Sequence, residues 1–138
     1  MKRIFQTSVH KNLGDCQRAA IASLFDLDNV EMVPHFKLYS DNWWKVMYNF
    51  CRGLGYNHMG CEYVKRLRLY KKYSVGGYYY AAVKSRTFKG ATHAVIINRK
   101  GVVVHDPNPN KMFLGVNVVK SKELEYVYKF HKRTDKYL

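Results

Sequence analysis

The sequence is short of the features that mark secreted and membrane proteins. It has three cysteines, an odd number without the spacing of a disulfide framework, which favours a reduced, intracellular protein. No window approaches the roughly 18 consecutive apolar residues of a membrane-spanning helix. Residues 1–14 contain no apolar h-region, so no secretory signal peptide is expected. We therefore expect a cytoplasmic protein without a membrane partner.

The chain also lacks internal repeats, low-complexity tracts and Pro-, Gly- or Ser-rich linkers, so residues 1–138 are expected to form one domain. Its hydrophobic content of 47% is sufficient for a core and excludes a disordered composition. Neither a Gly-rich phosphate loop nor a dinucleotide fingerprint nor a nucleic-acid-binding signature is present, and no cofactor is expected.

Acidic residues are scarce, with ten against 24 lysines and arginines, and none lies between Tyr63 and His105. A field of this sign favours an acidic protein surface, nucleic acid or an anionic substrate as partner; the alternative is a soluble protein with a merely basic surface. Residues 63–73, "YVKRLRLYKKY", alternate basic with apolar and aromatic residues, as an exposed strand with a basic face would. This segment supplies a candidate basic patch of Lys65, Arg66, Arg68, Lys71 and Lys72.

The first half of the chain has helical patterns. "CQRAAIASLF" predicts a helix over 16–25, with Asp15 as its N-cap or first-turn acid. A second helix is predicted after Asp41 as cap, with stop signals at Gly53 and Gly55. Its expected core-facing stripe is Trp44, Met47, Tyr48, Cys51 and Leu54.

From Glu62 onward the pattern changes to short β-rich runs separated by turn residues. "NRKG" at 98–101 predicts a tight hairpin. The runs predict an α+β fold, with a mainly helical lobe over 1–60 packed on an antiparallel meander over 61–138. They cover residues 63–70, 77–85, 92–98, 101–106, 114–120 and 124–130.

Three residues in these elements suggest chemistry together. At the start of a helix, free N–H groups and the helix dipole lower the pKa of a thiol such as that of Cys16, and they can also hold an oxyanion. His93 begins one strand of the predicted hairpin and Asp106 ends the other, so the hairpin brings them side by side. Such a carboxylate holds the imidazole in the tautomer that accepts the thiol proton. The pattern predicts a Cys–His–Asp triad.

Each residue alone has a simpler explanation. Cys16 is explained as a small buried hydrophobe, His93 as a hydrogen-bonded strand residue, and "HDPNP" as a turn. His105 is expected to point to the opposite face of its strand from Asp106, which makes it a weaker candidate base than His93.

A zinc site is not expected, because no Cys-x-x-Cys pair and no usual ligand spacing is present. The residues weighed for it are His35, Cys51, His58 and Cys61.

"GDCQRAAIASLFDLDNVEMVPHF" and "THAVIINRKGVVVHDPNPNK" resemble the small papain-like cysteine-hydrolase proteins of bacteriophages and bacteria. More distantly, they are similar to the bacteriocin-processing peptidases of ABC exporters. The resemblance covers about Gln6 to Lys111. It implies Cys16 as nucleophile, His93 as general base and acid, and Asp106 as the residue that orients His93.

Papain-like enzymes also carry a glutamine several residues before the nucleophile, which binds the oxyanion. Gln6 is the only glutamine upstream of Cys16, ten positions before it, and is the predicted oxyanion residue, with Asn12 as the alternative. Trp43 is predicted to line the substrate groove, and Trp44 is a further candidate; the alternative is that one of the two packs in the core and the other lies at the surface.

The function expected from residues and resemblance is hydrolysis of an amide, isopeptide or thioester bond through an acyl-enzyme on Cys16. Acyl transfer uses the same triad with a different acceptor. A phage-type protein is expected to act in the host cytoplasm on a host protein. The alternative is a basic binding protein for a host protein or nucleic acid, with a vestigial triad.

Overall fold

The alanine-rich segment after Asp15 forms the first helix, α1 (Cys16–Leu24), in the computed structural model, which describes residues 1–7, 15–63 and 68–134. Alanine has the highest helix propensity, and its small side chain lets a helix approach a sheet closely. Residues 19–24 are all buried. The helix predicted over 16–25 is confirmed, with its last residue at Leu24. It packs mainly on strand β3 (Thr92–Ile97).

The second helix, α2 (Trp43–Gly53), follows a 3₁₀ helix, η2 (Phe36–Asn42). The prediction that Asp41 caps this helix is wrong, because Asp41 lies inside η2 and Asn42 occupies the N-cap position. Met47 and Cys51 are fully buried as predicted. Trp44 was expected on the same buried face but is 37% exposed. The side chains that pack against the core beside Met47 are those of Trp43, Val46 and Phe50.

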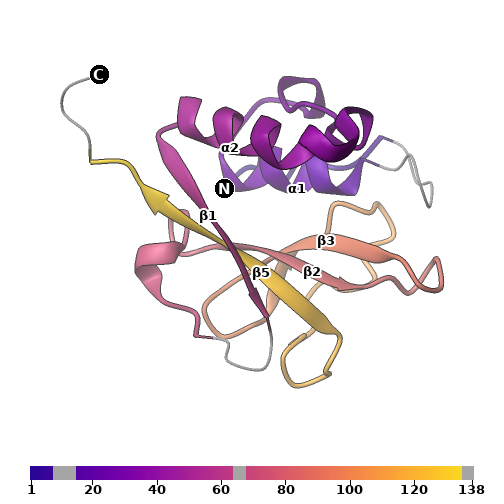
Figure 1. Cartoon of the computed structure of the whole chain (residues 1–138). Helices are drawn as coiled ribbons and strands as arrows, with labels where there is room; N and C mark the ends of the chain where they lie inside the picture. Colours follow the sequence, from indigo (N-terminus) through magenta and orange to yellow (C-terminus); the bar gives the residue numbers. More distant parts are fainter. Residues whose placement is uncertain (8–14, 64–67, 135–138) are drawn as a thin grey trace.

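Five antiparallel strands form one sheet in the order β1-β5-β2-β3-β4. β2, β3 and β4 form a meander as predicted, but β5 enters between β1 and β2 (Figure 1). The α+β class is confirmed, whereas a meander running through all strands is wrong. The strands are β1 (Tyr56–Tyr63), β2 (Tyr79–Lys84), β3 (Thr92–Ile97), β4 (Val103–His105) and β5 (Leu124–Lys132).

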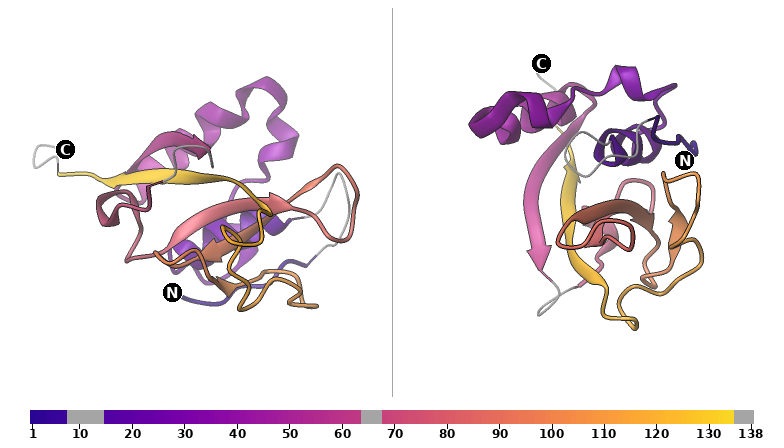
Figure 2. Two further views of the ribbon diagram at one scale, coloured as in Figure 1. Left: turned by 90° about the horizontal axis from the view of Figure 1, so that it is seen from below. Right: turned by 90° about the vertical axis from the view of Figure 1, so that its right-hand side faces the viewer.

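The sheet is covered on both faces, which explains why β2 and β3 are almost continuously apolar. Helices α1 and α2 lie on one face (Figures 1 and 2), where Tyr80, Ala94 and Ile96 contribute to their core cluster. The other face packs against Phe113 and Val118 from the chain between β4 and β5. Alternating residues of β2 and β3 therefore belong to two different cores.

Three predicted boundaries differ from the structure. β1 begins at Tyr56, so a helical lobe over 1–60 ends inside a strand. The strand predicted over 63–70 is wrong in its described part, since only Tyr63 is in a strand and residues 68–70 are irregular. Residues 114–120 are mostly turns, and of the predicted strand only an isolated antiparallel bridge from Asn117 to Val102 is present. Gly115 has a φ of 82°, and local hydrogen bonds such as Val116 N–H to the Phe113 carbonyl close the chain.

Neither helix among the described residues is long and apolar enough to cross a membrane. All three cysteines are described, and none forms a disulfide. Cys51 is fully buried, and burial raises the pKa of its thiol to about 12, so it is a core residue without thiolate character.

His58 is a buried titratable residue on β1 under α2. Its ring lies within 5 Å of three aromatic rings, with centroid distances of 4.5 Å to Trp44, 4.6 Å to Tyr128 and 4.9 Å to Phe130. Nδ1 accepts the N–H of Gly60 at 3.1 Å, so the neutral ring carries its proton on Nε2. Burial lowers the pKa of His58 to about 4, because a charged imidazolium is unfavourable among these rings.

We expect the fold to lose stability as the pH falls from 6.5, the ordinary pKa of histidine, to about 4, because the unfolded chain binds a proton that folded His58 rejects. The loss attributable to His58 is about 3 kcal/mol in the free energy of unfolding. Urea unfolding of wild type, His58→Phe and the exposed control His131→Gln between pH 4 and 7 measures it. A His58→Phe profile as steep as the wild-type profile would contradict this assignment.

Candidate active site

Cys16 lies at the first position of α1, where its side chain borders a pocket between the helix and the sheet. Asp15 occupies the N-cap position, but its side chain makes no capping hydrogen bond to the helix. Its carboxylate instead accepts the N–H of Thr7 at 3.0 Å and the Thr7 hydroxyl at 2.7 Å. Asp15 thus holds the N-terminal segment against the start of α1.

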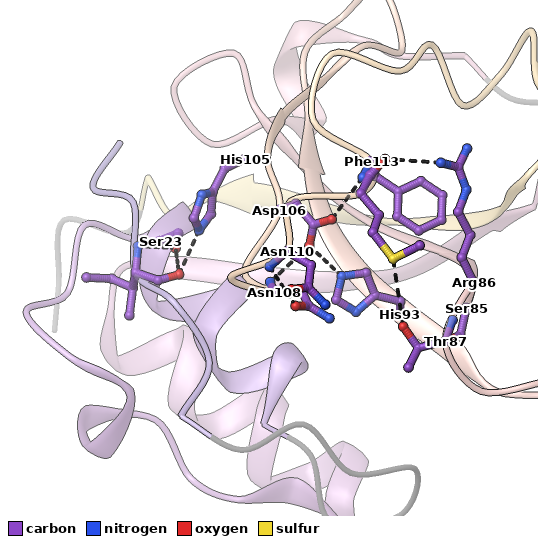
Figure 3. Close-up of polar contacts among 12 residues, drawn as sticks. Ser23, Ser85, Arg86, Thr87, His93, His105, Asp106, Asn108, Asn110 and Phe113 are labelled. Carbon is purple, nitrogen blue, oxygen red and sulfur yellow. Dashed lines mark hydrogen bonds and ion pairs between the residues drawn. The ribbon is translucent and has the colours of Figure 1, made fainter.

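His93 and Asp106 are in direct contact, as the hairpin predicted. His93 Nε2 lies 2.6 Å from Asp106 Oδ1. Asp106 is 1% exposed and also accepts the N–H groups of Asn108 at 3.0 Å and Phe113 at 3.1 Å (Figure 3). Three hydrogen-bond partners on one buried carboxylate leave little freedom for it to turn. His93 therefore has one ring nitrogen committed to Asp106 and presents Nδ1 to other groups.

The electrostatics favour a charged His93. Burial alone would lower its pKa, but hydrogen bonds to Asp106 and Cys16 outweigh burial and raise the pKa to about 9. Burial likewise opposes the charge on Asp106, yet the hydrogen bond from His93 and those from two backbone N–H groups hold the pKa of Asp106 below its ordinary value. An imidazolium in contact with Cys16 stabilises the thiolate. The geometry therefore suits a thiolate–imidazolium pair backed by a carboxylate.

A stacked layer supports His93 from behind. The Phe113 ring lies 6.0 Å from the His93 ring at an interplanar angle of 27°, and the guanidinium carbon of Arg86 lies 4.3 Å from the Phe113 ring centre. Arg86 is held by Glu123 at 2.5 and 2.8 Å and by the Met112 carbonyl at 3.0 Å. Phe113 thus fixes both members of the pair, since its ring packs on His93 and its N–H binds Asp106 (Figure 3).

His105 faces away from this site, as predicted. It donates from Nε2 to the Ile4 carbonyl at 2.6 Å (Figure 3). Its ring packs edge-on against Phe5, with ring centroids 5.1 Å apart. Burial lowers the pKa of His105, which keeps the ring neutral. It is a structural residue that binds the N-terminal segment to β4.

The pocket beside Cys16 has a volume of about 290 Å³. Ala82 and Ala94, directly paired on β2 and β3, leave open space over the sheet. Tyr80 and Tyr128 stack beside them with ring centroids 4.3 Å apart, and burial raises the pKa of both phenols, so they stay neutral. Besides Cys16 and His93, the pocket is lined by uncharged residues: Gln17, Phe36, Trp43, Tyr80, Ala82, Thr92, Ala94, Tyr126 and Tyr128.

Not all of the residues predicted to bind the substrate or the oxyanion, or to form the basic patch, lie at the pocket. Trp43 lines the pocket. Gln6 is buried beside Pro107, whose carbonyl accepts the Gln6 N–H at 2.9 Å, and it is not among the residues that line the pocket. Asn12 lies outside the described residues, as do Lys65 and Arg66 of the candidate basic patch. Arg68, Lys71 and Lys72 of that patch are exposed.

The zinc ligands that were weighed do not converge: within residues 1–7, 15–63 and 68–134, no three Cys, His, Asp or Glu side chains are placed to share a metal.

Several residues of the site were not anticipated. Gln17 adjoins Cys16 and donates to the Tyr128 hydroxyl at 3.3 Å, a position that its place in the sequence could have suggested. Tyr126 and Tyr128 are two residues apart and so share a strand face, but only the strand order brings that face to Cys16. Nothing in the spacing of the chain pointed to Phe113 or Arg86.

We expect Asp106→Asn to lower the pKa of His93 from about 9 toward the ordinary value of 6.5, because the variant removes the carboxylate charge that stabilises the imidazolium. An NMR titration of the His93 ring measures this. Asp28→Asn, which changes an exposed carboxylate paired with Lys2, is the matched control and should leave the titration unchanged. An unaltered His93 titration in Asp106→Asn would refute the coupling.

Comparison with known proteins gives no relative for this arrangement: no protein-family model, no curated protein and no solved structure matches the chain. The contacts of Cys16, His93 and Asp106 therefore carry the functional argument by themselves.

Proposed function

We propose that this protein is a papain-like cysteine hydrolase that cleaves an amide, isopeptide or thioester bond through an acyl-enzyme on Cys16. One observation carries the proposal: His93 bridges Asp106 and Cys16 at the edge of an apolar pocket, with the nucleophile at the start of a helix, His93 on β3 and Asp106 directly after β4. The resemblance of the two sequence segments to small phage and bacterial papain-like proteins supports the same conclusion.

The reaction begins with the Cys16–His93 ion pair. The thiolate attacks the substrate carbonyl carbon and forms a C–S bond, and the carbonyl electrons move to oxygen. When the tetrahedral intermediate collapses, the C–N or C–S bond to the leaving group breaks and His93 protonates that group. Water, losing a proton to His93, then cleaves the thioester and releases the carboxylic acid and Cys16. Asp106 orients His93 throughout, and neither a metal nor a cofactor is required.

The oxyanion of the intermediate would be bound by N–H groups of the first turn of α1, which point along the helix dipole. Gln6 is the proposed side-chain donor, by resemblance to the upstream glutamine of papain-like enzymes. Gln17 is a further amide at the rim of the pocket, with its Nε2 already directed to Tyr128.

The pocket determines which side chain or acyl group the substrate can have next to the cleaved bond. Its walls are aromatic rings and alanines, and apart from the catalytic pair it has no charged lining residue in the described chain. Burying a charged group there without a charged partner would cost several kcal/mol. Burying an apolar side chain there would instead be favourable by about 2 kcal/mol. We therefore propose that the pocket binds an uncharged, apolar side chain or acyl group of the substrate.

By resemblance, the setting is a phage-encoded protein in the host cytoplasm with a host protein as substrate. The same acyl-enzyme would serve acyl transfer if an amine or thiol replaced water as the acceptor.

We expect iodoacetamide at pH 6 to label Cys16 on the order of tenfold or more faster than glutathione, because the ion pair keeps the thiol ionised below its ordinary pKa. His93→Ala should remove that advantage. Cys61→Ser is the matched control, since burial raises the pKa of the Cys61 thiol and Cys51 is fully buried. Peptide mass spectrometry locates the label.

Labelling of Cys16 no faster than glutathione, with no effect of His93→Ala, would exclude the hydrolase. Full biological activity of Cys16→Ser would favour the alternative of a binding protein with a vestigial triad.

The pocket assignment is testable with haloacetamide probes that differ only in one substituent. We expect a benzyl or isobutyl probe to label Cys16 about tenfold faster than a carboxymethyl probe, and Trp43→Ala to reduce this preference. Leu38→Ala is the control, because Leu38 is 73% exposed and does not line the pocket. A preference for the charged probe would refute the assignment.

A further inference from the structure

The end of the sheet opposite the candidate active site carries a basic groove of about 600 Å³. Four cationic side chains line it: Arg68, Arg99, Lys100 and Lys120. Arg99 and Lys100 belong to the tight turn between β3 and β4, while Lys120 comes from the turns that precede β5. Three segments that are distant in sequence thus bring positive charge to one place.

The groove is built on fixed backbone. The Asn98 side chain accepts the N–H groups of Lys100 at 2.9 Å and Val102 at 3.1 Å, which holds the turn. Asn117 donates to the Lys100 carbonyl at 3.1 Å, which ties the turn to the segment before β5. Gly101 permits this close approach, because a Cβ there would lie 2.8 Å from Val119.

These cations have no counter-charge. No acidic residue lines the groove, and in the part of the chain that the structure describes none of the four side chains forms an ion pair. Four uncompensated positive charges in one groove repel each other and attract an anion whose negative charges are spread over a similar length. The groove therefore has the electrostatics of a polyanion site.

We propose that this groove binds the sugar-phosphate backbone of a single-stranded nucleic acid. Arginine guanidinium groups bind phosphate oxygens through strong charge-assisted hydrogen bonds, and the groove holds two of them, Arg68 and Arg99, of which Arg99 is positioned by a hydrogen bond from its Nε to the Leu69 carbonyl at 3.4 Å. Leu69 and Val119 give it apolar walls, and Tyr70, the residue after Leu69, is 51% exposed with Lys72 5.7 Å from its ring centre. A basic groove beside an exposed aromatic ring is typical of single-strand binding, whereas an acidic protein gives the ring no base to stack on.

The site is independent of the proposed thiol chemistry. His93 is the second residue of β3 and Asn98 follows the end of that strand, so about 17 Å of strand separates the triad from the turn. The bound strand would leave the pocket beside Cys16 open. Nucleic-acid binding and thiol reactivity should therefore be separable by mutation.

The test is fluorescence anisotropy of labelled oligo(dT) with the full chain, over a range of salt concentrations. Four phosphate contacts predict a slope of about −3 for log K against log salt. The double variant Arg99→Ala/Lys100→Ala should bind about tenfold more weakly and reduce the slope by about 1.4. Lys45→Ala/Lys89→Ala removes the same charge from exposed residues outside the groove and should change the affinity less than about twofold.

Two further variants test the remaining parts of the proposal. Tyr70→Ala should weaken oligo(dT) binding about tenfold while Tyr70→Phe retains it, because only the ring is needed for stacking. Cys16→Ser should bind as wild type, and the groove variant should keep wild-type Cys16 labelling, so failure of either proposal is seen separately.

Three results would overturn the inference. An equal loss in the Lys45/Lys89 control would show that binding follows total charge and not the groove. Competition by oligoglutamate as effective as by unlabelled oligo(dT) would point to an acidic protein partner. Equal affinity for the matching duplex, with no effect of Tyr70→Ala, would exclude the single-stranded assignment.

Discussion

The register of the β3–β4 hairpin is the constraint on which the candidate active site depends. The Asn98 side chain closes the turn, and Gly101, with a φ of 83°, lets Val119 pack against it. Ile96 then pairs with His105, and Asp106, the next residue, reaches His93. Because side chains alternate along a strand, a slip of one residue would turn Asp106 to the opposite face. A turn far from Cys16 thus decides whether His93 has an acidic partner.

A second constraint joins the hairpin to α1, the helix that begins at Cys16. The N-terminal segment bonds to α1 through Ile4 N–H and the Ser23 hydroxyl at 2.9 Å, and to β4 through the Ile4 carbonyl and His105 at 2.6 Å. Gln6 extends this link to the Pro107 carbonyl. None of these contacts involves Cys16 or His93, yet together they set the distance between Cys16 and the His93–Asp106 pair.

Parts of the fold and the site that depend on interactions between residues near in sequence could be predicted, whereas parts that depend on contacts between distant segments could not. The helix after Asp15 and the hairpin around Asn98 depend on neighbouring residues, so the sequence was enough to place Cys16, His93 and Asp106. The exposed Trp44 depends on the 3₁₀ helix before α2, which propensity did not indicate. The aromatic pocket and the basic groove depend on strand order and loop packing, which local patterns do not encode.

The central position of β5 has a consequence for how the protein is made. β5 is the last of the five strands, yet it pairs with β1 on one side and β2 on the other, and it supplies Tyr126 and Tyr128 to the pocket. During synthesis α1, α2 and the β2–β3–β4 meander leave the ribosome first, but β1 has no sheet partner until β5 follows. Such long-range pairing slows folding. Cys16 therefore acquires its complete pocket only after residue 128 has been translated, so the nascent chain carries this thiol without the tyrosine side of the pocket.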